Sequence, residues 1–96
     1  MQLGSFRSKG LRQLHEDENV RGISPAKADK LRKLLFALEN AETLKQLGQF
    51  PGWKLHQLKG NLKGFWSLTV TGNWRLIFRH DEKTNTASDI DLIDYH

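Results

Sequence analysis

The chain has 96 residues, a length typical of one compact domain, and 15 Lys and Arg against 11 Asp and Glu give it a net charge of +4. It contains no cysteine, which excludes a disulfide framework and thiolate zinc sites. No basic segment leads into an apolar signal sequence, and no apolar run approaches the roughly 20 residues that span a bilayer. We therefore expect a soluble, cytoplasmic protein with a single domain over residues 1–96.

The first half of the chain is expected to be mainly helical. A short edge strand in residues 1–6, weakened by Gly4, precedes a short helix from Lys9 to about Asp17. Ser24-Pro25 then opens a longer helix, because serine can cap and proline at the first helical position needs no N–H. A further helical turn is expected from Thr43 to Leu47. Residues at helical spacing give the longer helix one core-facing stripe: Ala28, Leu31, Leu34, Leu35, Leu38 and Ala41.

The second half, after the break at Pro51-Gly52, has the pattern of an antiparallel sheet. Gly72-Asn73 is a plausible two-residue hairpin turn between two alternating strands. The core face of that hairpin would carry Trp66, Leu68, Val70, Trp74, Leu76 and Phe78. Strands are expected over Lys54–Leu58, Phe65–Thr71, Trp74–Arg79 and Ser88–Ile93. Helices followed by an antiparallel sheet predict the α+β fold class.

Basic and aromatic residues are interleaved in this second half. Cations for phosphates beside flat rings for bases are typical of a nucleic-acid surface. A sheet with its aromatics inside and its cations in water explains the same composition equally well. The residues concerned are Lys54, Lys59, Lys63, Arg75 and Arg79, beside Trp53, Phe65, Trp66, Trp74 and Phe78. The basic run of the long helix, Lys27 to Lys33, is interpreted as a solvated face rather than an RNA site.

Two arginines, Arg75 and Arg79, are expected on the same, outer face of the return strand because side chains alternate along a strand. A guanidinium can hold a phosphate with a planar fork, which favours an anion site there. The alternative is that the arginines pair with Asp89 and Asp91 of the next strand.

Histidines supply candidates for proton transfer. His15 and His80 are interpreted as ordinary surface residues. If the sheet brings His56 and His96 together, two imidazoles could exchange protons with a ribose hydroxyl and a leaving oxygen. Arg75 would then stabilise the transition-state charge together with a nearby lysine, Lys59. The acidic run DIDLIDYH is weak support for a metal site, and we expect neither a metal nor another cofactor.

The run KLHQLKGNLKGFWSLTVTGNWRLIFRH, joined to the terminal DLIDYH, resembles the HigB family of toxins within the RelE/ParE superfamily. The upstream segments SFRSKGL and LENAETLKQLG resemble the family as well, so the resemblance covers essentially the whole chain. It implies a RelE-like fold, with N-terminal helices packed on a mainly antiparallel, twisted sheet of four to five strands. It also implies the toxin of a type II toxin–antitoxin system.

The same resemblance implies an endoribonuclease (mRNA interferase) that cleaves translated mRNA in the A site of the 70S ribosome and arrests growth, using the 2′-hydroxyl as nucleophile. It implies that the partner is a HigA-type helix-turn-helix antitoxin and that the toxin contacts operator DNA only through this antitoxin. It implies no membrane partner. The family pattern assigns RNA positioning to Asn73, and it assigns catalysis to Arg75, Lys59, His56, Asp94, Tyr95 and His96. Further candidates for binding RNA are Lys54, Lys63 and Arg79.

Two departures from the family pattern lie near these positions. Gln57 replaces the usual proline, and Asn61 replaces a common acidic residue, so a carboxylate at position 61 has no role here. The alternatives to the nuclease are a non-cleaving toxin of the ParE type that acts on DNA gyrase, a non-catalytic nucleic-acid-binding module, and an antitoxin partner whose active site has been lost.

Overall fold

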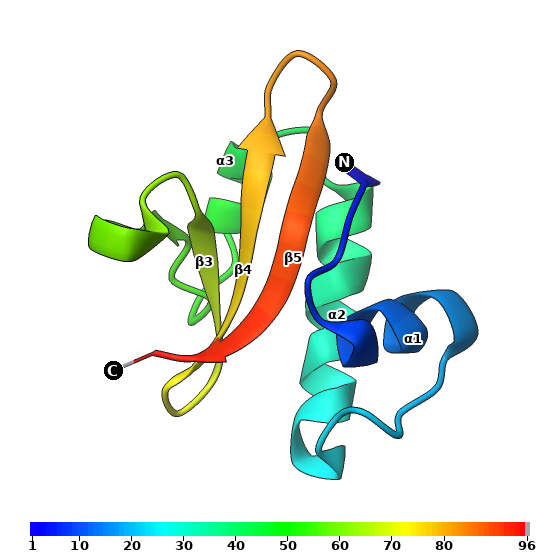
Figure 1. The fold of residues 1–96 in the computed structure, drawn as a ribbon. Helices are drawn as coiled ribbons and strands as arrows, with labels where there is room; N and C mark the ends of the chain where they lie inside the picture. Colours follow the sequence, from blue (N-terminus) through cyan, green and yellow to red (C-terminus); the bar gives the residue numbers. More distant parts are fainter. Residues whose placement is uncertain (96) are drawn as a thin grey trace.

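Within residues 1–95, which a computed structural model describes, three helices pack on a five-stranded sheet (Figure 1). This arrangement confirms the α+β class. The helices are α1 (Lys9–Asp17), α2 (Pro25–Asn40) and α3 (Leu44–Gly48), with a single 3₁₀ turn, η1 (Gly60–Leu62). The strands are β1 (Gln2–Leu3), β2 (His56–Gln57), β3 (Trp66–Thr71), β4 (Trp74–Asp81) and β5 (Thr86–Asp94).

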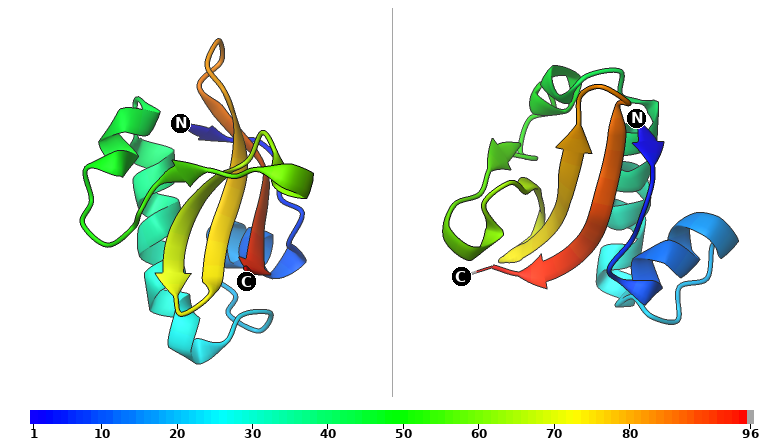
Figure 2. Two further views of the ribbon diagram at one scale, coloured as in Figure 1. Left: turned by 90° about the vertical axis from the view of Figure 1, so that its left-hand side faces the viewer. Right: turned by 45° about the horizontal axis from the view of Figure 1, so that its top comes forward.

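The strand order is β1-β5-β4-β3-β2, so the first strand joins the sheet beside the last. The β1–β5 pair is parallel, and the three other pairs are antiparallel. Helices α1 and α2 lie on the same face of the twisted sheet (Figure 2). The other, outer face of the sheet is therefore not covered by these two helices.

Local signals explain where the helices begin. The Ser8 hydroxyl caps α1 by accepting a 3.2 Å hydrogen bond from the Leu11 N–H. Ser24 occupies the N-cap position of α2, as the sequence predicts, but its side chain makes no capping bond. Its carbonyl oxygen instead accepts the N–H groups of Lys27 and Ala28, and Pro25 takes the position that needs no donor.

The main core lies between α2 and the sheet. Leucines of α2 pack against Leu68, Val70, Leu76 and Phe78 of β3 and β4, and these side chains are at most 6% exposed, while Trp66 and Trp74 of the same strands are partly buried against them. This confirms the predicted helical stripe and the predicted core face of the hairpin. The central residues are Leu31, Leu34, Leu35 and Leu38 from the helix, and Leu68, Val70, Leu76 and Phe78 from the sheet.

A second apolar cluster, which the sequence reading did not anticipate, covers part of the outer face. Leu58, Phe65 and Ile77 are buried there, and Leu62 of η1 and Ile93 of β5 pack against them. The segment between β2 and β3 thus folds back over the sheet.

Each of the five predicted strands differs in length from the observed one. β3 begins one residue later and β4 ends two residues later than expected. The edge strand expected over residues 1–6 is ordered as β1 for two residues only. The strand expected over Lys54–Leu58 is reduced to His56–Gln57, because Lys54 has a positive φ of 50° that interrupts extended backbone. The last strand is longer than expected and runs from Thr86 to Asp94.

Candidate active site

The end of β5 is held against the β3–β4 turn. Asp94 lies in register with Trp74, and the Tyr95 N–H donates a 2.8 Å hydrogen bond to the Asn73 carbonyl. Ile93, one residue before Asp94, lies in register with Arg75. Three predicted site positions, Asn73, Asp94 and Tyr95, are thereby brought to the same end of the sheet as Arg75. His96 lies outside the described residues.

Arg75 is half-buried and is fixed by the turn that precedes it. Its Nη1 donates to the carbonyl oxygens of Gly72 at 2.7 Å and Trp74 at 3.0 Å. No ion pair found within residues 1–95 involves Arg75. Both hydrogen bonds use a single nitrogen, so the Nε–Nη2 edge is the part of the guanidinium suited to grip an oxyanion in a bidentate manner.

Arg79, in contrast, is engaged by the protein itself. Its Nε lies 3.4 Å from an Asp89 carboxylate oxygen, and its guanidinium lies 4.4 Å from the centroid of the Phe65 ring. A shift of register in the β4–β5 pairing between Ile77 and Arg79, with Asp89 at a φ of 51°, accompanies this pairing. The alternative considered for the two arginines, pairing with the next strand, therefore holds for Arg79.

The two arginines are also too far apart to bind the same phosphate group. Four residues of strand separate them, which is about 13 Å at the usual rise per residue. Asp91, the other expected carboxylate partner, accepts the N–H of Leu92 at 2.9 Å. The geometry thus separates Arg75, as a candidate for binding phosphate, from Arg79, which stabilises the outer face.

His56 lies on the outer face, in register with Ser67 of β3, which in turn is in register with Ile77 of β4. Its exposed ring contacts the Lys54 carbonyl oxygen through Nδ1 at 2.9 Å. Because a carbonyl oxygen only accepts, Nδ1 carries the proton in this contact, and Nε2 of the neutral ring is left as the base.

His56 and Arg75 share this face without touching each other. Two strand spacings and two residues of rise separate their Cα atoms, about 12 Å in a regular sheet. A bound RNA strand would have to bridge the two residues. The buried Ser67 lies between β2 and β4, and its Oγ has no hydrogen-bond partner within the described chain.

The candidate lysines flank the segment that covers the outer face. Lys59 immediately precedes η1 and Lys63 immediately follows it, and both are exposed. Because Leu62 of η1 and Ile93 of β5 pack on the same apolar cluster, these two lysines lie near the strand that ends in the tail. Lys54 is also exposed, and the bend at its positive φ directs the chain into β2.

The sequence reading missed one cation beside this end of the sheet. Lys27, interpreted as part of a solvated helix face, places its Nζ 4.5 Å from the centroid of the Trp74 ring. It brings a positive charge from α2 to the residue next to Arg75. Forty-seven residues separate Lys27 from Trp74 in the sequence, so no local pattern could have revealed the contact.

No group of three or more His, Asp and Glu side chains within residues 1–95 is arranged to hold a metal ion. None of the helices in the same part of the chain is long and apolar enough to cross a membrane.

Known proteins resemble this chain over most of its length. "Endoribonuclease HigB" of Proteus vulgaris is 35% identical over 92 residues, which cover 96% of this chain and 97% of that protein. "Toxin HigB-1" of Vibrio cholerae is 35% identical over 75 residues, 77% and 79% of the two chains. The solved structure of a YoeB/ParE toxin from Agrobacterium tumefaciens shares the fold, with a TM-score of 0.62 and 18% identity over 100% of this chain and 99% of that one.

The sequence model of a family described as "RelE-like toxin of type II toxin-antitoxin system HigB" matches residues 4–96. The chain therefore belongs to the HigB-like family of RelE-like toxins.

Proposed function

We propose that this toxin is an endoribonuclease that cleaves mRNA while the message is being translated in the A site of the 70S ribosome. The observation that carries the proposal is Arg75, half-buried, anchored through Nη1 alone, and placed across from the strand that delivers Asp94 and Tyr95. The endoribonuclease name of the Proteus vulgaris relative supports it over nearly the full length of the chain.

The proposed reaction needs no metal, because RNA carries its own nucleophile. The 2′-oxygen attacks the adjacent phosphorus while the bond from phosphorus to the 5′-oxygen breaks, which gives a 2′,3′-cyclic phosphate and a 5′-hydroxyl. One group takes the proton of the 2′-hydroxyl, and another gives a proton to the leaving 5′-oxygen. Arg75 and Lys59 would stabilise the additional negative charge on the phosphate oxygens.

The proton-transfer roles are assigned as follows. His96 is the main proton-transfer group, and His56 assists through Nε2 because its Nδ1 is held by the Lys54 carbonyl. Asp94 and Tyr95 would orient the end of the tail. For Tyr95, the bond from its N–H to the Asn73 carbonyl supports that role.

RNA positioning is assigned to Asn73 and to the exposed lysines at positions 54 and 63. Since Arg79 is paired with Asp89, it is assigned to the fold and not to RNA binding. The proposed partners are a HigA-type helix-turn-helix antitoxin, the ribosome and the message, with operator DNA reached only through the antitoxin.

A translation reaction with a modified message tests the chemistry directly. A short message would be translated in a purified system after a 2′-deoxynucleotide has been placed at the mapped cleavage position. We expect the deoxy position to block cleavage there, while an unmodified message of the same sequence is cut. Cleavage at the deoxy position would contradict attack by the 2′-oxygen, and equal cleavage without ribosomes would contradict dependence on translation.

A further inference from the structure

Phe36 is the most exposed large apolar side chain within residues 1–95. It lies on α2 with 70% of its surface exposed, against 45% for Phe50 and 40% for Val20. It falls outside the stripe of leucines that α2 buries against the sheet. Burial of an aromatic ring is a large source of binding free energy, so a ring displayed in this way marks a candidate contact surface.

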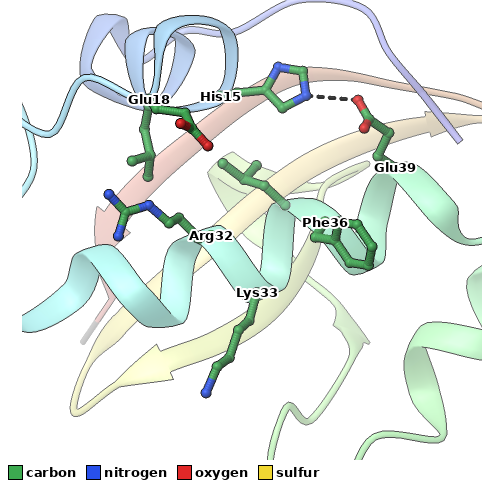
Figure 3. A pocket seen from close by; sticks show the side chains of 8 residues that line it. His15, Glu18, Arg32, Lys33, Phe36 and Glu39 are labelled. Carbon is green, nitrogen blue, oxygen red and sulfur yellow. Dashed lines mark hydrogen bonds and ion pairs between the residues drawn. The ribbon is translucent and has the colours of Figure 1, made fainter.

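Two hollows flank this ring. The first, of about 400 Å³, lies between α1 and α2, where the His15 ring contacts the Glu39 carboxylate at 2.8 Å (Figure 3). The second, of about 620 Å³, lies between α2 and the α3–β2 segment. Phe36 and Lys33 line both hollows, and we term the exposed Phe36 ring together with the two hollows the Phe36 groove.

The larger hollow is preformed by stacked rings. Phe50 and Trp53 lie with their ring centroids 4.0 Å apart and their planes inclined by only 13°. The floor is completed by Ala37 and Leu47. Such a rigid apolar recess suits a bulky aliphatic or aromatic side chain of a partner, because little conformational freedom is lost when it is filled.

The charges around the larger hollow are positive. Lys33 is the one charged residue in its lining, and the Lys30 Nζ lies 5.4 Å from the centroid of the Trp53 ring. This rim favours a partner with acidic side chains beside its apolar anchor. An apolar recess does not suit an RNA phosphate backbone. The smaller hollow carries both signs of charge, with Glu18 and Glu39 beside Arg32, but a second copy related by a two-fold axis through the larger hollow would place one positive rim against another.

We infer that the Phe36 groove is the docking surface for a segment of the cognate antitoxin that presents a bulky apolar side chain flanked by Asp or Glu. The inference deepens the proposed function, on which it rests for the antitoxin as the partner. The groove lies on the helical side of the sheet, while Arg75 lies on the outer face, so the two can be altered separately.

The test measures binding without any requirement for cleavage. Toxin carrying Arg75→Ala would be titrated with the full-length cognate antitoxin, alone and with Phe36→Ala or Val20→Ala added. The Phe36→Ala change should weaken binding by roughly 30-fold or more, and Val20→Ala by less than about threefold. Because Phe36 is mostly exposed, the variant is expected to fold, which circular dichroism and thermal melting would verify.

A charge reversal gives a second, independent readout. Lys33→Glu should weaken antitoxin binding and reduce the salt dependence of that binding. The control is Lys83→Glu, at an exposed lysine in the turn before β5, and it should leave both the affinity and its salt dependence unchanged. Unchanged affinity in both groove variants, or no binding of the antitoxin to the parent toxin, would overturn the inference. Loss of a toxin dimer in Phe36→Ala with antitoxin affinity retained would assign the groove to a second copy instead.

These outcomes are distinct from a failure of the proposed function. If the wild-type toxin cuts no message but Phe36→Ala still loses antitoxin binding, the groove inference stands and the nuclease proposal fails. If Phe36→Ala lowers cleavage while antitoxin affinity is unchanged, the groove serves the ribosome or RNA, and the inference fails.

Discussion

The N–H of Tyr95 donates a 2.8 Å hydrogen bond to the carbonyl of Asn73, which ties the residue that follows β5 to the turn before Arg75. This bond, together with the register of Asp94 against Trp74, keeps the end of β5 beside the only arginine of β4 that takes part in no ion pair within residues 1–95.

Tyr95→Pro should lower cleavage by about 100-fold, because proline has no N–H to donate to Asn73 and misplacement of catalytic groups by about 1 Å can have this effect. Tyr95→Ala keeps the N–H and removes only the ring, so it separates anchoring from any role of the side chain. Rates on a translated message would be compared at equal toxin concentration. Equal rates for the proline and alanine variants would show that the anchor has no functional role.

Arg75→Ala should lower the rate of cleavage by about 10² to 10³, the usual effect of removing one group that stabilises an oxyanion. The fold should persist, because Arg75 is bonded only to carbonyl oxygens of its own turn within the described chain. Single-turnover cleavage and a thermal melt would be measured together. Arg12→Ala, at an exposed position of α1, serves as the matched control and should retain the wild-type rate.

Arg79→Ala should behave in the opposite way to Arg75→Ala. It removes a partly exposed ion pair with Asp89 and a cation–π contact with Phe65, and should lower the free energy of unfolding by about 1 kcal/mol. For a domain of this size, that change corresponds to a melting temperature lower by roughly 4–8 °C. Cleavage below the melting range should stay within about threefold of wild type. A loss of cleavage as large as that of Arg75→Ala, without a change in stability, would show that Arg79 takes part in RNA binding.

Gly64→Ala should lower the free energy of unfolding by about 1–3 kcal/mol. Gly64 has a φ of 95°, and an added Cβ would lie 2.8 Å from Nη1 of Arg79, so the substitution introduces backbone strain and a steric clash. Urea denaturation would be compared with Gly48→Ala, where an added Cβ meets the Leu55 side chain at an ordinary 3.6 Å. The control should be neutral or slightly stabilising, because alanine restricts the unfolded chain. Equal effects at both positions would contradict the account of Gly64.

The parts of the fold with a local cause could be predicted from the sequence. The helical stripe from Leu31 to Leu38 and the alternation around the Gly72-Asn73 turn depend on periodicity alone, and both are confirmed. The resemblance to the HigB family is confirmed by the family that matches residues 4–96. The roles assigned to individual site residues remain predictions.

The features that could not be predicted depend on pairs of residues far apart in the sequence or on departures from regular backbone. Arg79 meets Asp89 where the register shifts at a residue with positive φ, and nothing in the alternation of β5 signals that shift. The covering of Ile77 by the β2–β3 segment likewise depends on a chain reversal through η1. Phe36 could have been noticed, because it falls outside the helical stripe, but the two hollows beside it require the packing of α1 and α3 around α2.

The most direct test of the central claim is to map message ends in growing bacteria. Wild-type toxin and Arg75→Ala would be induced separately, and new 5′ ends would be located by primer extension on abundant messages. We predict cuts phased with codons inside translated regions for the wild type, and none for the variant. Growth arrest by the wild type without new 5′ ends would contradict the nuclease account and favour a target such as gyrase, and cuts that persist in Arg75→Ala would contradict the placement of Arg75 at the site of cleavage.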